Sequence, residues 1–83
     1  MNKKIEQQIA KALLMNKTTD QMVDFLRGVL TPKEMIEISR RLEIVKMLKK
    51  GIPQRLIAEE LGVGVATVTR GSKELQQGRF KNV

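Results

Sequence analysis

The sequence predicts an all-α protein built from five helices, and three observations predict this fold class. Apolar residues recur at three- and four-residue steps along most of the 83 residues, which is the period of amphipathic helices. Helix-capping signals and glycines divide the chain into five such stretches. No stretch shows the strict alternation of apolar and polar residues that is typical of a half-exposed strand. We therefore expect a single helical domain over residues 1–83.

Two amphipathic helices are predicted in the first thirty residues. The first covers Ile5 to Leu14, where apolar residues form one stripe. The second begins after Thr18, which stands three residues before Gln21 in the spacing of a capping box. Its helical period continues to about residue 27 or 28, so we expect this helix to be short.

A long third helix is predicted from about residue 32 to residue 50. Thr31 and Glu34 have the capping-box spacing, and Pro32 at the first helical position loses no needed hydrogen-bond donor. Gly51 suits the left-handed conformation that ends many helices. The helical period predicts a buried stripe of Met35, Ile38, Leu42, Val45 and Leu48.

Two short helices flanking a tight turn are predicted next, over about residues 53–75. Pro53 stands where a helix can begin, and Gly62 permits a positive φ in the turn. Ala58 is small enough for the second helix to cross closely over the first. This pattern is typical of a helix-turn-helix, although any short helical pair with a glycine turn would also show it. Residues 76–83 have no helical period, and we expect them to form a loose tail.

Composition excludes several classes of function. The chain has no cysteine and no histidine, so disulfides, Cys/His zinc sites, thiol nucleophiles and histidine acid-base catalysis are ruled out. No paired carboxylates or phosphate loop can be assembled, so we expect no enzyme and no enzyme cofactor. No apolar run approaches the roughly 20 residues that span a bilayer, and no signal-peptide core follows the polar start. We expect a cytoplasmic protein without membrane contact.

The charge balance indicates a polyanionic partner. Sixteen basic against nine acidic residues give a net charge of +7, and most of the excess lies after residue 30. If the helix-turn-helix is real, its recognition helix runs from Val65 to Lys73, and nucleic acid is the expected partner. The small N-terminal side chains of this helix let its backbone approach base edges, while the first helix grips phosphates. The predicted DNA-binding residues are Gln54, Arg55, Gly64, Val65, Ala66, Thr67, Thr69 and Lys73.

Three segments of the chain together resemble the tryptophan repressor family. They are the run Thr67-Val68-Thr69-Arg70-Gly71-Ser72, the segment Leu30-Thr31-Pro32-Lys33-Glu34, and the helix from Arg41 to Gly51. The likeness covers about residues 20 to 76. The Thr-Arg-Gly-Ser run is its specific part, because a glycine inside a recognition helix costs about 1 kcal/mol relative to alanine and must answer some need.

The resemblance implies an intertwined helical homodimer that binds a double-stranded DNA operator when loaded with a small-molecule amino acid, L-tryptophan, as corepressor. Two arginines of the family sandwich the indole, and the matching residues are Arg41 and Arg70, with Arg70 also pairing the ligand carboxylate. The remaining predicted ligand-binding residues are Gly28, Leu30, Thr31, Ile44, Val45, Gly71 and Glu74. From spacing alone, Arg41 would equally suit a snorkelling surface arginine, and Arg70 a phosphate contact.

Three residues depart from the family pattern. Glu74 replaces a serine that helps to hold the ligand's ammonium, and its carboxylate would either pair with that ammonium or repel the ligand's carboxylate. Gly28 replaces a leucine whose backbone carbonyl assists, and Ala58 replaces a lysine that contacts DNA. Glu74 therefore leaves the identity of the effector open.

Two other functions stay open on the sequence. One is a ligand-independent or differently liganded helix-turn-helix regulator, which Glu74 favours and which a tryptophan titration of DNA affinity would test. The other is a helical dimerisation module that binds a protein partner, for which any nucleic-acid binding would depend little on salt.

Overall fold

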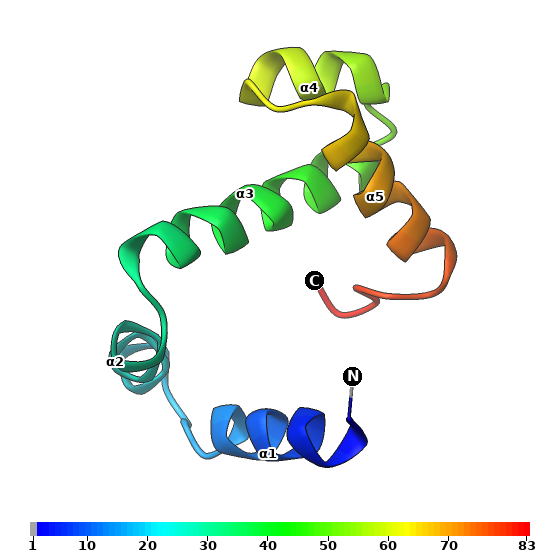
Figure 1. Cartoon of the computed structure of the whole chain (residues 1–83). Coiled ribbons are helices and arrows are strands. Elements are labelled where there is room, and N and C mark those ends of the chain that lie inside the picture. Colours follow the sequence, from blue (N-terminus) through cyan, green and yellow to red (C-terminus); the bar gives the residue numbers. More distant parts are fainter. Residues whose placement is uncertain (1) are drawn as a thin grey trace. The chain divides into compact units, whose positions relative to one another are not determined.

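The computed structural model describes residues 2–83, which form helices and no strand (Figure 1). The helices are α1 (Lys3–Leu14), α2 (Thr19–Val29), α3 (Pro32–Lys49), α4 (Gln54–Leu61) and α5 (Val65–Gln76). The predicted all-α class with five helices is confirmed. The chain divides into two compact units, residues up to 35 and residues 36–83, and each is described by itself.

The first unit consists of α1, α2 and the start of α3. Thr18 caps α2, since its hydroxyl accepts a hydrogen bond from the Gln21 amide at 3.1 Å. The Gln21 side chain in turn accepts from the amide of Lys17 at 2.7 Å, one residue earlier than a capping box would have it. Neither α1 nor α2 contains a buried residue. The apolar stripes of both helices therefore lack a core of their own.

Helix α3 begins and ends as its sequence predicts. The Glu34 amide donates to the Thr31 hydroxyl at 3.2 Å, and the Thr31 amide donates to the Glu34 carboxylate at 2.9 Å. At the other end, Gly51 has a φ of +80°. These reciprocal hydrogen bonds confirm the capping box.

The predicted buried stripe of α3 is largely wrong. Of its five residues only Val45 is buried, and Ile38 remains 40 % exposed. The buried residues of α3 are instead Ile44, Val45 and Met47. The reason is that α3 carries apolar residues on several sides, so its period alone does not define one face, and α4 and α5 pack near its C-terminal end.

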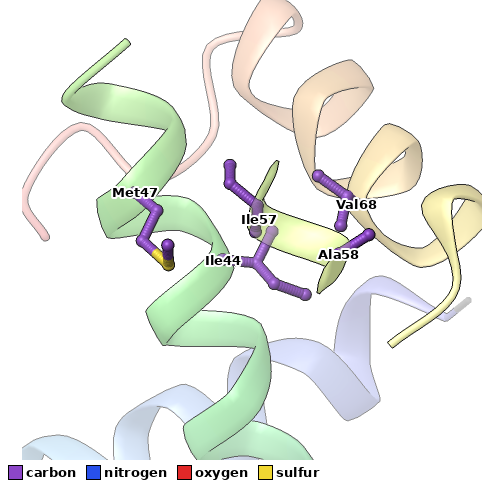
Figure 2. Packing of buried hydrophobic residues seen from close by; sticks show 5 residues of the cluster. All are labelled: Ile44, Met47, Ile57, Ala58 and Val68. Atoms are coloured by element: carbon purple, nitrogen blue, oxygen red, sulfur yellow. The ribbon is translucent and has the colours of Figure 1, made fainter. Parts of the chain in front are cut away.

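The core of the second unit lies where α3, α4 and α5 meet. Ile57 of α4 and Val68 of α5 have no exposed surface, and Ala58 is 6 % exposed. Figure 2 shows Ile57 next to Ile44 of α3, while the Ala58 side chain points toward α5, which carries Val68. The turn between α4 and α5 contains Gly62 at a φ of +65°, as predicted. Burial of these side chains holds the two short helices against α3.

Within residues 2–83, no helix is both long and apolar enough to cross a membrane. The same residues contain no cluster of three or more acidic side chains suited to holding a metal ion.

Candidate ligand pocket and recognition helix

A cavity of about 610 Å³ lies in the second unit and is lined by α3, α5 and the segment after α5. Its volume falls within the range of about 300–1,000 Å³ that is usual for small-molecule sites. Figure 1 shows α5 crossing the C-terminal half of α3, which brings the two helices that line the cavity together. The lining residues are Arg41, Ile44, Val45, Ala66, Thr67, Arg70, Gly71, Glu74, Arg79 and Phe80.

The apolar part of the pocket is made by the crossing of α3 and α5. Ile44 and Val45 are each only 2 % exposed. A Cβ atom on Gly71 would lie 3.2 Å from Cγ2 of Ile44 and 3.6 Å from Cδ1 of Leu48. Because the first contact is tighter than ordinary packing, a Cβ atom at this position would require the Ile44 side chain to shift by a few tenths of an ångström. The close approach of two helices is thus one need that Gly71 answers, and it was not evident from the sequence.

The polar part of the pocket is dominated by arginines. Arg41 on α3 and Arg70 on α5 are exposed and line the same cavity from different helices. Neither forms an ion pair within the described part of the chain, where the Nε of Arg79 lies 3.5 Å from Oε2 of Glu74. Arg41 also lines a smaller cavity of about 300 Å³. Two planar cations facing one cavity suit a ligand that carries both a flat ring and a carboxylate.

The structure brings together most of the residues predicted to bind a ligand. Six of the nine line the pocket: Arg41, Ile44, Val45, Arg70, Gly71 and Glu74. Gly28, Leu30 and Thr31 belong to the first unit, and their part in a ligand site stays a prediction.

Two lining residues, Arg79 and Phe80, had no role in the sequence analysis. They follow the last helix, where no periodicity relates them to the other elements. The one signal that could have pointed to Arg79 is Glu74, an acidic residue five positions earlier with Gly78 between them to turn the chain.

The predicted recognition helix is α5, and its start is accessible. Val65 is 50 % exposed, and Ala66 and Thr67 are exposed as well. The hydroxyl of Thr69 donates a hydrogen bond to Oε1 of Gln54 at 2.8 Å, which ties α5 to the first residue of α4. With its oxygen occupied, the Gln54 amide still has N–H donors for a phosphate.

The remaining predicted DNA contacts are also accessible. Arg55 on α4 and Lys73 on α5 are exposed cations, and Gly64, which caps the start of α5, is exposed as well. Ala66 and Thr67 line the ligand pocket as well, so one stretch of α5 takes part in both predicted surfaces.

Comparisons with known proteins agree on one family. The family described as Trp repressor protein matches residues 5–82. The Trp operon repressor homolog of Vibrio parahaemolyticus is 39 % identical over 71 residues, which are 84 % of this chain and 69 % of that protein. The homolog of Vibrio vulnificus is 48 % identical over 52 residues, 61 % of this chain and 51 % of that protein. The homolog of Actinobacillus succinogenes is 44 % identical over 54 residues, 64 % of this chain and 54 % of that protein. No solved structure matches the chain.

Proposed function

The chain belongs to the Trp repressor family, a family of transcription regulators rather than enzymes, and from this premise we propose that it is an operator-binding repressor activated by L-tryptophan. The observation that carries the proposal is the cavity of about 610 Å³ in which Arg41 of α3 and Arg70 of α5 face one space. One wall of this cavity is the recognition helix itself. A ligand held there touches the element that reads DNA.

The proposed mechanism is a change in the tilt of the recognition helix. A ligand between α3 and α5 contacts Arg70 and Gly71, which lie on the recognition helix, and Arg41, which does not. It therefore has a different affinity for each tilt of α5, which is the condition under which a ligand shifts a conformational equilibrium. The tilt that tryptophan stabilises is the one that fits the major groove.

The proposed active form is a homodimer. The apolar residues of α1 and α2 are exposed, with Ile5, Ile9 and Val29 all more than 45 % accessible. Helices with such uncovered stripes need a further apolar surface, and a second copy of the chain supplies one. Two recognition helices in a symmetric dimer would then enter successive major grooves about 34 Å apart.

The experiment that tests the function measures DNA affinity with and without L-tryptophan. Double-stranded DNA selected from a random pool in the presence of protein and tryptophan serves as the operator, and fluorescence anisotropy of the labelled DNA reports binding. We expect tryptophan to tighten binding by tenfold or more, since coupling free energies of about 1–3 kcal/mol are typical. Equal affinity with and without tryptophan would instead favour a ligand-independent regulator.

Two matched arginine variants separate the two surfaces. Arg70→Ala should abolish the response to tryptophan, because the residue lines the cavity. Arg55→Ala should weaken DNA binding but leave tryptophan affinity intact, because Arg55 lies on α4 and is not part of the cavity lining. If Arg70→Ala binds tryptophan as tightly as the unchanged protein does, the assigned ligand site is wrong.

A further inference from the structure

Residues 77–83 after α5, here called the C-terminal segment, turn back onto the helices that line the ligand pocket (Figure 1). Gly78 has a φ of +89° and Phe80 a φ of +62°, a backbone conformation that is uncommon for a bulky side chain. Lys49 at the end of α3 holds the segment, since its Nζ donates to the backbone oxygens of Phe80 and, at 2.6 Å, of Val83. The segment thereby forms one wall of the cavity.

This turn brings Arg79 to Glu74. The amide of Arg79 donates to the backbone oxygen of Glu74 at 3.1 Å, and Nε of Arg79 lies 3.5 Å from Oε2 of the same residue. Both side chains line the pocket. They are partly solvated, with 64 % of the Arg79 side chain and 38 % of the Glu74 side chain exposed. The interaction energy of this solvated ion pair is therefore modest.

Glu74 has a second basic neighbour by sequence. It follows Arg70 by four residues on α5, so the two side chains lie one turn apart on the same face of the helix. Oppositely charged residues at this spacing attract each other. In the structure Glu74 instead pairs with Arg79, and Arg70 forms no ion pair within residues 2–83. Arg70 is thereby left available to a ligand in the cavity.

We propose that Arg79 is a specificity-determining residue of the pocket. By pairing with Glu74 it keeps that carboxylate away from Arg70, so that Arg70 can bind the carboxylate of a ligand. This inference rests on the proposed function, in which Arg70 holds the ligand. The sequence left open whether the Glu74 carboxylate would repel the carboxylate of the ligand. When the positive charge of Arg79 is paired with Glu74, this repulsion is removed.

The test compares three indole ligands that differ in which charged groups they carry: L-tryptophan has both, indole-3-propionate has the carboxylate alone, and tryptamine has the ammonium alone. The chain contains no tryptophan and no tyrosine, so the fluorescence of each ligand reports its binding without background from the protein. The proteins compared are the unchanged chain, Arg79→Gln, Glu74→Gln with Arg79→Gln, and Lys81→Gln. The last variant removes one positive charge from the same segment at a residue that does not line the cavity.

With Arg79→Gln we expect tryptophan and indole-3-propionate to bind about twofold to fivefold more weakly at low salt, the range of a partly exposed ion pair. Tryptamine should not weaken. The double variant should restore binding of both carboxylate ligands, because the neutral amide that replaces the Glu74 carboxylate no longer competes for Arg70. Lys81→Gln should leave all three affinities unchanged. High salt should shrink these differences.

The inference is overturned if Arg79→Gln and Lys81→Gln weaken binding equally, because overall charge would then explain the effect. Failure of the double variant to restore binding also overturns it. Either result leaves the proposed function intact as long as the unchanged chain binds tryptophan. If the chain binds indole-3-propionate but not tryptophan, the proposed effector is wrong and the inference about Arg79 is still tested. If no indole binds, both proposals fail.

Discussion

Gly71 of α5 passes so close to Ile44 of α3 that a Cβ atom would come within 3.2 Å of Cγ2 of Ile44. The crossing of these two helices forms the core of the second unit together with α4, and it forms the apolar part of the candidate ligand pocket. A single glycine thus links the packing of α5 against α3 to the shape of the candidate pocket.

Substitution of Gly71 should lower the affinity for ligand more clearly than it lowers the stability of the fold. In Gly71→Ala, a gain of about 1 kcal/mol in helix propensity is offset by overpacking of about 1–3 kcal/mol, so unfolding free energy should fall by at most about 2 kcal/mol. Tryptophan affinity should fall more clearly, because the methyl group enters the cavity lining. Urea unfolding and ligand titration measure the two effects. For the unfolding measurement alone, Gly28→Ala is the control for helix propensity, since nothing lies within 4 Å of its added Cβ.

Truncation of Ile57 should show how much the small core contributes. Its side chain is fully buried among α3, α4 and α5. We expect Ile57→Val to lower the free energy of unfolding by about 0.5–1.5 kcal/mol and Ile57→Ala by about 2–5 kcal/mol. Urea unfolding followed by circular dichroism measures both. Equal losses for the two variants would contradict the packing described.

The hydrogen bond between Thr69 and Gln54 should stabilise the arrangement of α4 and α5. Thr69→Val removes the donor while keeping the shape of the side chain, and a neutral hydrogen bond contributes about 0.5–1.5 kcal/mol. A double-mutant cycle with Gln54→Leu isolates the coupling between them. A coupling energy indistinguishable from zero would show that the bond does not tie the two helices together.

The start of α3 should lose stability in acid. Hydrogen bonds to the Glu34 carboxylate from the Thr31 backbone amide and, to a smaller extent, from the Thr31 side chain lower the pKa of this carboxyl below its ordinary value of 4.5. A lowered pKa in the folded state means that the contribution is fully present above pH 4.5 and is lost as the pH falls through the lower folded value. NMR titration of the Thr31 and Glu34 amides measures this. In Glu34→Gln the acid-dependent change at these amides should disappear.

DNA binding should depend steeply on salt, because exposed cations such as Lys73 would contact phosphates. Anisotropy titrations between about 50 and 200 mM salt give the slope of log affinity against log salt. Lys73→Ala should reduce this slope by about 1 if the residue meets a phosphate. A flat dependence for the unchanged chain would favour the protein-binding module over the repressor.

The ends of the helices were predictable because capping acts between near neighbours. Thr31 and Glu34 cap α3 as their spacing predicts, and Gly51 and Gly62 have the positive φ values expected of them. The buried face of α3 was not predictable. The helix carries apolar residues on several of its own sides, and their spacing does not show which side α4 and α5 cover. The candidate pocket was predictable only in part. Arg41 and Arg70 were predicted from the family motif, whereas Arg79 lies in a segment without periodicity.

By itself, the sequence determined the helical class, the positions of the turns, the positive charge and the absence of cysteine and histidine chemistry. These properties depend on composition or on residues a few positions apart. Only the tertiary structure decided that Ile44 rather than Ile38 is buried, that Gly71 packs closely against Ile44, and that Arg79 rather than Arg70 pairs with Glu74. The physical reason is that the first two depend on packing between helices far apart in the chain, and the third on how the backbone turns after α5, which periodicity does not encode.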